Sequence, residues 1–175
     1  LHTPILDKIM QLITHLGDMG IIWIILTIVM LLIPKTRKSG VIMASALIVD
    51  LILCNGILKP LIARIRPFDV NSAIQLIVAK PHDYSFPSGH TAASTTSFVM
   101  LLINTFTAVM ALYLAGEKKL WKIALVLAVL IAFSRLYLYV HYPTDVLGGI
   151  ITGAIAGYIG YKLTFIVQSK HRKKL

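Results

Sequence analysis

The sequence has few charged residues and almost no cysteine. Of its 175 residues 14% are charged, whereas about a quarter of a soluble domain usually is. Cys54 is the single cysteine, which excludes an internal disulfide and a thiolate cluster for zinc. Its apolar neighbours predict a small buried side chain. The 57% of residues that are hydrophobic indicate a polytopic membrane protein, and we expect one domain over residues 1–175.

Acidic residues are also scarce, with 7 Asp and Glu against 17 Lys and Arg, and the net charge is +10. Such a charge can indicate nucleic-acid binding. Here, however, the basic residues lie at the ends of apolar blocks, and no basic stripe is interleaved with exposed aromatic residues. Membrane topology therefore explains the charge, and the sequence predicts neither a nucleic-acid partner nor an obligate protein partner.

Apolar blocks approach the ~20 residues that a membrane-spanning helix needs. Five segments qualify: 19–34, 41–58, 91–114, 120–140 and 146–167. Residues 1–17 instead have apolar side chains at helical spacing with Asp7, Lys8 and Gln11 between them. This pattern is typical of an amphipathic helix lying on the membrane surface. The predicted fold is all-α: a polytopic membrane helical bundle of about five transmembrane helices plus this N-terminal interfacial helix.

The connectors between the apolar blocks alternate in charge. Three are short and rich in Lys and Arg, at 34–38, 116–122 and 170–174. Because positive loops stay in the cytoplasm, these three are expected there. The connector 59–90 and the turn 141–145 then share the opposite, extracytoplasmic face. The chemically interesting residues lie in these two segments, so we expect a multi-pass protein of the cell membrane with an extracytoplasmic active-site loop over 59–90.

Three cations should meet on that face. Lys59 and Arg66 follow the second apolar block, and Arg135 lies inside the fourth, where an arginine is costly without a partner. The segment Ser88-Gly89-His90 opens the third block and places a helix N-terminus beside them. Guanidinium groups and free backbone N–H groups both bind phosphate oxygens, and Gly89 allows an anion to approach the backbone. The sequence predicts a site for a tetrahedral oxyanion.

Two histidines can divide a reaction at such a site. His141 and Asp145 are four residues apart, so on one helical turn the carboxylate can hold the imidazole by its Nδ1–H. His141 is then a candidate nucleophile towards phosphorus, which gives a phosphohistidine. His90 can protonate the leaving oxygen and afterwards activate water.

These residues are open to two alternative interpretations. His90, His141 and Asp145 are potential metal ligands, but a dication there would lie beside three fixed cations with one acidic ligand. We therefore expect no metal and no other cofactor. Ser88 is an alternative nucleophile, but it has no adjacent base and a serine at a helix start is an ordinary N-cap, so we expect it to bind phosphate.

Taken in order, the motifs resemble those of a known family. Residues 59–67 have Lys, six residues, then Arg-Pro; residues 87–90 read Pro-Ser-Gly-His; residues 134–145 have Ser-Arg, five residues, His, three residues, Asp. Together they are similar to the three-part signature of the type 2 phosphatidic acid phosphatase superfamily, which also includes vanadium haloperoxidases. The resemblance covers roughly residues 5–167. Membrane members often have six spans, so the first span here is expected to be reduced to the amphipathic segment, absent from this sequence or natively missing.

The resemblance implies metal-independent hydrolysis of a lipid phosphate or pyrophosphate through a phosphohistidine. By this likeness His141 is the nucleophile, His90 the acid and base, and Asp145 the partner that orients His141. The residues that the likeness assigns to phosphate binding are Lys59, Arg66, Ser88, Gly89 and Arg135. Because the chain is small, is expected to be bacterial and has little sequence outside the predicted bundle, undecaprenyl pyrophosphate is the favoured substrate. Phosphatidylglycerol phosphate and phosphatidic acid are the alternatives.

A different class of function also uses such arginines. An anion transporter would need polar residues along a path through the membrane and repeat symmetry among its spans, and the apolar blocks show neither. Outside the motifs, Asp50 lies in the middle of an apolar block, where we expect it to pack against Asn55 or a Ser or Thr of another helix. His82 and Asp83 are interpreted by default as solvated loop residues. The alternative is that they gate access to the site or bind lipid head groups.

Overall fold

The computed structural model describes residues 3–17, 20–71, 76–78, 84–87 and 105–172, and the regular secondary structure of these residues is helical. The N-terminal half contains α1 (Pro4–Leu16), α2 (Ile21–Leu32), α3 (Arg37–Asp50), the π-helix η2 (Leu51–Leu58), α4 (Lys59–Ile62) and α5 (Pro67–Val70). The C-terminal half contains α6 (Thr105–Leu114), α7 (Leu120–Tyr137) and α8 (Pro143–Arg172). The all-α prediction is confirmed for these residues.

Three helical stretches are long and apolar enough to cross a membrane: Arg37–Val70, Leu120–Tyr137 and Pro143–Lys170. They correspond to three of the five predicted spans. A fourth is possible if α1 and α2, which meet at 43°, form one bent span. The predicted span 91–114 lies partly outside the described residues, and its described part is the short apolar helix α6. The structure thus supports a multi-pass protein with three or four candidate spans, and the number five stays a prediction.

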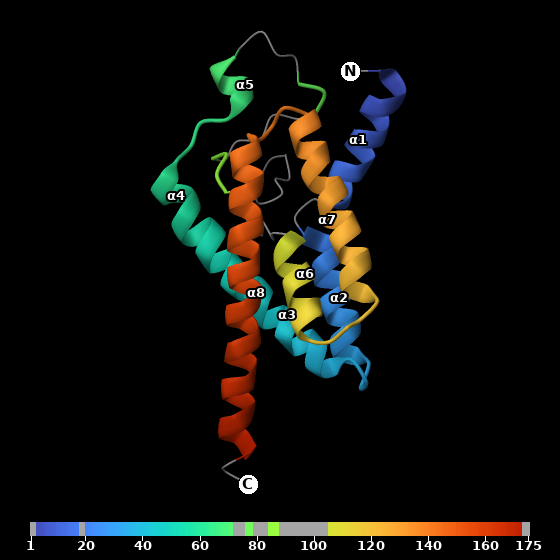
Figure 1. Cartoon of the computed structure of the whole chain (residues 1–175), viewed down its shortest axis with the longest axis vertical. Helices are drawn as coiled ribbons and strands as arrows, with labels where there is room; N and C mark the ends of the chain where they lie inside the picture. Colours follow the sequence, from blue (N-terminus) through green and yellow to red (C-terminus); the bar gives the residue numbers. More distant parts are fainter. Residues whose placement is uncertain (1–2, 18–19, 72–75, 79–83, 88–104, 173–175) are drawn as a thin grey trace.

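The expected N-terminal helix is present, and Thr3 caps it by accepting a hydrogen bond from the backbone N–H of Leu6. It packs along α7 instead of standing apart from the bundle (Figure 1). The bent span that α1 can form with α2 is a second placement for a segment predicted to lie on the membrane surface. Its position relative to the bilayer stays a prediction.

The core of the bundle is apolar and closely packed. Trp23, Met43 and Leu112 bring together α2, α3 and α6, and each is almost completely buried. Helices α3 and α8 share an extensive interface, and there they approach so closely that a Cβ on Gly160 would overlap the backbone of Ala46. Glycine at this position therefore allows the two helices that lead to the candidate site to pack tightly.

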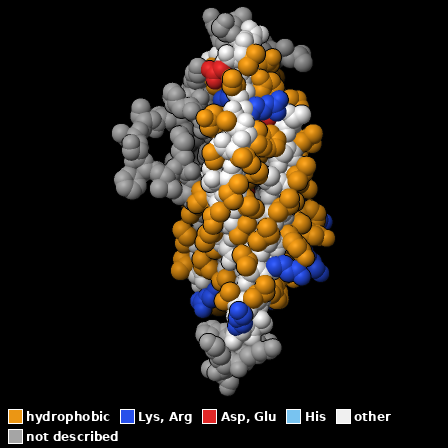
Figure 2. Space-filling view, turned by 90° about the vertical axis from the view of Figure 1, so that its left-hand side faces the viewer, with side chains coloured by type: hydrophobic (Ala, Val, Ile, Leu, Met, Phe, Trp, Pro, Cys, Tyr) orange, Lys and Arg blue, Asp and Glu red, His pale blue; other side chains and the backbone are white. Residues whose placement is uncertain are grey.

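The two ends of the bundle differ in what they contain. The α2–α3 turn, the α6–α7 connection and the C-terminal end of α8 lie at one end, whereas α5, the start of α1 and the α7–α8 turn lie at the other (Figure 1). The lysine-rich connectors thus share one end, as predicted, and Ser39 Oγ donates to Glu117 Oε1 at 2.6 Å there. Between the ends the visible surface is mostly hydrophobic (Figure 2). Such a surface is expected of helices surrounded by lipid.

Asp50 is fully buried at the end of α3. Its Oδ1 accepts hydrogen bonds from Thr107 Oγ1 at 3.0 Å and from Cys54 Sγ at 3.2 Å. The expectation that Asp50 packs against a threonine of another helix is confirmed, because Thr107 belongs to α6. Cys54 is buried as predicted.

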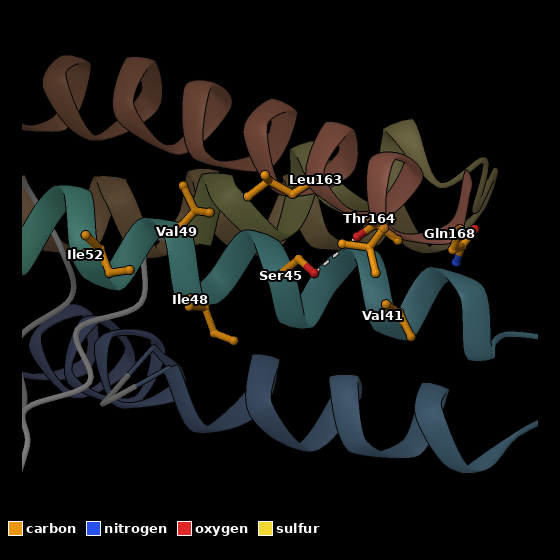
Figure 3. A pocket seen from close by; sticks show the side chains of 9 residues that line it. Val41, Ser45, Ile48, Val49, Ile52, Leu163, Thr164 and Gln168 are labelled. Atoms are coloured by element: carbon orange, nitrogen blue, oxygen red, sulfur yellow. Dashed lines mark hydrogen bonds between the residues drawn. The ribbon is translucent and has the colours of Figure 1, made fainter. Parts of the chain in front are cut away.

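An apolar groove of about 330 Å³ runs between α3 and α8 (Figure 3). Its one internal polar contact in Figure 3 is the hydrogen bond from Thr164 Oγ1 to Ser45 Oγ, at 3.1 Å. Its lining comprises Val41, Ser45, Ile48, Val49, Ile52, Leu163, Thr164, Val167 and Gln168. None of these is a predicted site residue, so the groove is a feature of the lipid-facing surface and not of the candidate active site.

Candidate active site

The α7–α8 turn ties Val140, the residue before His141, to the backbone of Arg135. Helix α7 ends with Tyr139 in the left-handed region, at φ 60°. The N–H of Tyr139 donates to Leu136 O and the N–H of Val140 donates to Arg135 O, the two bonds of a Schellman ending. The chain reverses within these residues, and Asp145 lies in the first turn of the following helix α8. His141 is thereby held between the end of one helix and the start of the next.

The segment after α4 brings a second set of charges to this turn. Ala63, at φ 45°, ends α4 and turns the chain, and Arg66 is in extended conformation before Pro67 starts α5. Ser85 N–H donates to Arg64 O at 2.8 Å, which ties the residues before Phe86 to this segment. Because alternate residues of an extended chain face the same side, Arg64 and Arg66 both reach the α7–α8 turn.

Arg66 and His141 are in direct contact. The Arg66 Nη1 lies 3.3 Å from His141 Nε2 and donates to Val140 O at 2.8 Å. Both side chains are nearly inaccessible, at 1% and 3% of full exposure. A guanidinium group only donates hydrogen bonds, so Nε2 must be the acceptor and the proton of the neutral ring belongs to Nδ1. This tautomer leaves the lone pair that a nucleophile needs on Nε2.

Asp145 lies on the other side of the ring. Its Oδ2 is 3.6 Å from His141 Nδ1, longer than a hydrogen bond. The predicted pairing of the two residues is thus present as a close approach of their side chains. Asp145 is fully buried and accepts three shorter hydrogen bonds: from Arg64 Nη1 at 2.7 Å, from Ser85 Oγ at 2.5 Å and from Tyr142 N at 2.9 Å. These donors fix the carboxylate behind the imidazole.

The ring of His141 is neutral in this environment. Burial, together with the positive charges of Arg66 and Arg135, lowers the pKa of His141 from an ordinary value of 6.5 to about 3. Asp145 acts in the opposite direction but does not outweigh burial. At neutral pH the imidazole is therefore unprotonated, in agreement with the hydrogen bond that its Nε2 accepts.

Arg135 lies in the last turn of α7 and is 3% exposed. Its charge acts on His141, as the lowered pKa of that histidine reflects. Its Nη1 donates to Thr14 Oγ1 at 2.9 Å, and Thr14 belongs to α1. The structure therefore brings Arg66 together with Arg135, His141 and Asp145, and these last three all belong to the stretch 135–145.

Of the remaining predicted site residues, the structure describes Lys59 alone. Lys59 is buried at the junction of η2 and α4. Ser88, Gly89 and His90, like His82 and Asp83, lie outside the described residues. Phe86, two residues before Ser88, packs so closely on Gly148 of α8 that a Cβ there would overlap its ring. The roles of Lys59, Ser88, Gly89 and His90 stay predictions.

Three residues of this cluster were not predicted. Arg64 and Ser85 contact Asp145, and Thr14 contacts Arg135. A signal for Arg64 was available, since an arginine two positions before Arg66 on an extended segment must reach the same side. Nothing local distinguishes Ser85 or Thr14 from an ordinary hydroxyl residue.

Comparison with known proteins identifies the family. The profile of the PAP2 superfamily matches residues 36–168. The chain is 31% identical over 142 residues to an undecaprenyl-diphosphatase of Sulfolobus acidocaldarius, which covers 81% of this chain and 63% of that protein. It is 34% identical over 159 residues to phosphatidylglycerophosphatase B of Bacillus subtilis, which covers 89% of this chain and 74% of that protein.

A solved structure agrees with this assignment. The crystal structure of a transmembrane PAP2 type phosphatidylglycerolphosphate phosphatase from Bacillus subtilis superposes with a TM-score of 0.66 at 30% identity, over 93% of this chain and 78% of that one. The sequence motifs, the helical bundle and these likenesses lead to one conclusion. The chain belongs to the PAP2 superfamily and is a multi-pass membrane member of that family of phosphatases.

Proposed function

We propose that this protein hydrolyses the terminal phosphate of a lipid phosphate or pyrophosphate, with His141 as nucleophile. The observation that carries the proposal is the contact between Arg66 Nη1 and His141 Nε2, 3.3 Å apart in a buried setting. The nitrogen that would attack phosphorus is thereby next to a group that binds phosphate oxygens. A phosphoryl group entering here would replace the Arg66–His141 contact with contacts to its own oxygens.

The reaction follows from this arrangement. His141 Nε2 attacks phosphorus, a P–N bond forms and the bond from phosphorus to the leaving oxygen breaks. The Nδ1–H then carries a share of the positive charge, which Asp145 at 3.6 Å stabilises. By the motif assignment, His90 gives a proton to the leaving oxygen and afterwards takes one from the water that breaks the P–N bond.

The arginines can neutralise the phosphate without a metal. Arg66 contacts His141 and the charge of Arg135 acts on it, whereas Arg64 donates a hydrogen bond to Asp145. Fixed guanidinium groups in a buried site stabilise the charge that develops on the equatorial oxygens. We therefore propose a metal-independent reaction, with Lys59, Ser88 and Gly89 completing the phosphate site.

Undecaprenyl pyrophosphate is the substrate that we propose. The support is two relatives named as undecaprenyl-diphosphatases, at 31% and 26% identity. Other relatives are named as phosphatidylglycerophosphatase B and lipid A 4'-phosphatase, at 34% and 28% identity. Phosphatidylglycerol phosphate, which the first of these relatives supports, and phosphatidic acid, which the sequence motifs leave open, are the alternatives to undecaprenyl pyrophosphate.

Purified protein in detergent tests the reaction. Phosphate release from a short-chain lipid phosphate is measured in EDTA for the wild type, for His141→Ala and for His15→Ala, an exposed histidine that serves as the matched control. We expect activity in EDTA for the wild type and the control, and at least a 1,000-fold loss in His141→Ala, as for removal of other catalytic nucleophiles. Activity retained in His141→Ala contradicts the nucleophile, and loss in EDTA contradicts the metal-independent reaction.

Trapping tests the intermediate separately. A substrate labelled in its terminal phosphate is mixed with the enzyme and quenched in base, because phosphohistidine is labile in acid. The wild type should retain label and His141→Ala should not. A panel of undecaprenyl pyrophosphate, phosphatidylglycerol phosphate and phosphatidic acid, compared by kcat/KM in one detergent, then tests the proposed substrate.

The proposed extracytoplasmic side is open to a direct measurement. Tyr139→Cys and Lys118→Cys introduce exposed thiols at opposite ends of the bundle, and the native Cys54 is buried. A membrane-impermeant maleimide applied to intact cells should label Tyr139→Cys alone. Labelling of Lys118→Cys alone would place the site in the cytoplasm.

A further inference from the structure

Helix α1 presents a polar stripe to the rest of the protein. Asp7, Gln11 and Thr14 are spaced by four and three residues and so lie on one face of the helix. Asp7 Oδ1 accepts from Tyr137 OH at 2.6 Å, Gln11 Nε2 donates to Ile77 O at 2.9 Å, and Thr14 Oγ1 accepts from Arg135 Nη1 at 2.9 Å. Two of these contacts join α1 to α7, and the third joins α1 to the backbone of Ile77.

The opposite face of α1 is apolar and exposed. Ile5 and Leu12 are 75% and 67% exposed, whereas Thr14 is 2% exposed. A helix that only floated on a membrane surface would direct its polar residues to water. Here the three polar side chains of the stripe face the protein together with the buried Met10, whereas Ile5 and Leu12 face outward, so α1 is a packed element of the bundle on this side.

Among these contacts, the one made by Thr14 reaches the candidate phosphate site. Arg135 is buried, and a buried arginine needs partners that hold its planar group in one orientation. A hydroxyl oxygen accepts a hydrogen bond without cancelling the positive charge, whereas a carboxylate would compete with phosphate for the guanidinium. Thr14 is thus suited to fix one arm of Arg135 and to leave its charge available to a phosphate.

We propose that α1 is part of the active site and that Thr14 is a positioning residue for Arg135. This inference rests on the proposed role of Arg135 in binding phosphate. Thr14 acts through Arg135 and does not itself touch the substrate. Loss of its hydroxyl should therefore weaken phosphate binding more than it slows the chemical step.

The test compares Thr14→Val, which keeps the shape and removes the hydroxyl, with Thr14→Ser, which keeps the hydroxyl. Thr27→Val is the matched control, because Thr27 is also buried and its hydroxyl donates to Trp23 O within α2. KM, kcat and the Ki of orthovanadate, a tetrahedral oxyanion, are measured for each. For Thr14→Val we expect KM and Ki to rise about 10-fold with kcat within about threefold of wild type, since one charge-assisted hydrogen bond is lost. Thr14→Ser should recover most of this change, and Thr27→Val should not raise Ki.

A double-mutant cycle with Arg135→Gln separates positioning from a general effect on structure. If Thr14 acts through Arg135, Thr14→Val should raise Ki about 10-fold with Arg135 present and less than twofold in Arg135→Gln. Equal factors in both backgrounds, or an unchanged Ki in Thr14→Val, would overturn the proposal. The cycle can also be read from the shift in melting temperature that orthovanadate causes, which needs no turnover. A wild type that binds orthovanadate but releases no phosphate from lipids would refute the proposed function and leave the Thr14 test valid.

Discussion

Arg64 and Asp145 form an ion pair across 81 residues of sequence, with Arg64 Nη1 2.7 Å from Asp145 Oδ1. The same nitrogen donates to Thr144 Oγ1 at 2.6 Å, and the guanidinium lies 4.1 Å from the centre of the Tyr142 ring. Asp145 has no exposed side-chain surface, whereas Arg64 is 36% exposed. The carboxylate that faces His141 is thus held from the solvent side by Arg64. This arginine lies between Lys59 and Arg66 and is not one of the residues that define the first motif.

Replacing Arg64 should impair the chemical step. In Arg64→Gln the carboxylate loses a charge-assisted hydrogen bond, and because Arg64 is partly exposed we expect the low end of its effect, about a 10-fold fall in kcat with KM little changed. Steady-state kinetics on a lipid phosphate measure this. Arg37→Gln, at the opposite end of the bundle, is the control and should behave as wild type. A rise in KM with constant kcat would show instead that Arg64 binds the phosphate itself.

Ser85→Ala removes the hydroxyl that donates to Asp145 Oδ2 at 2.5 Å. The other oxygen of the carboxylate keeps Arg64 and the remaining donor is Tyr142 N, so Asp145 should stay in place but tilt. We expect a fall in kcat of about 10-fold, the size of one buried hydrogen bond. If Ser85→Ala retains full kcat, the carboxylate is held well enough by its other two donors.

The low pKa of His141 predicts how stability depends on pH. The unfolded chain binds a proton near pH 6.5 and the folded chain only near pH 3, so the free energy of unfolding falls as pH decreases between these values. The slope can reach about 1.4 kcal/mol per pH unit. Melting temperatures of the wild type and of His141→Gln, compared from pH 7.5 to pH 5, should show a steeper fall in the wild type. Parallel curves would mean that His141 titrates near its ordinary value in the folded protein.

Asp50 should matter for stability and not for catalysis. Asp50→Ala leaves the buried hydroxyl of Thr107 without this acceptor and opens a small cavity, for which we expect a loss of about 1–3 kcal/mol. Asp50→Asn keeps an acceptor oxygen and should lose less. Thermal unfolding in detergent gives the stability, and kcat per folded enzyme should stay within about threefold of wild type in both variants. A loss of kcat in well-folded Asp50→Asn would reassign Asp50 to the reaction.

Gly148 provides the space for the Phe86 ring on α8. A valine there would displace the ring and with it the backbone that leads into the Pro-Ser-Gly-His motif, so we expect Gly148→Val to lower activity at least 10-fold. The smaller side chain of Phe86→Leu should partly restore activity when it is combined with Gly148→Val. Absence of any rescue would place the effect of the valine elsewhere in α8.

Much of this protein follows from local features of its sequence. Hydropathy is a property of each segment by itself, so the apolar blocks at 41–58, 120–140 and 146–167 predicted three helices that the structure contains. The motifs around Arg66, Arg135 and His141 identified the family, because their order and spacing are also written along the chain. Burial of Asp50 against a threonine followed from the cost of a carboxylate in an apolar helix.

Side-chain convergence was decided only by the tertiary structure. Arg64 meets Asp145 and Thr14 meets Arg135 across 81 and 121 residues, and the rotation of each helix about its axis determines which side chains face each other. The amphipathic pattern of residues 1–17 shows the same limit, since a stripe of polar residues looks alike whether it faces water or a protein neighbour. By itself the sequence predicted three of the helices, the family and a set of candidate reactive residues, because hydropathy and motif spacing are local. Packing determined the partners that hold those residues, because each partner comes from a distant segment.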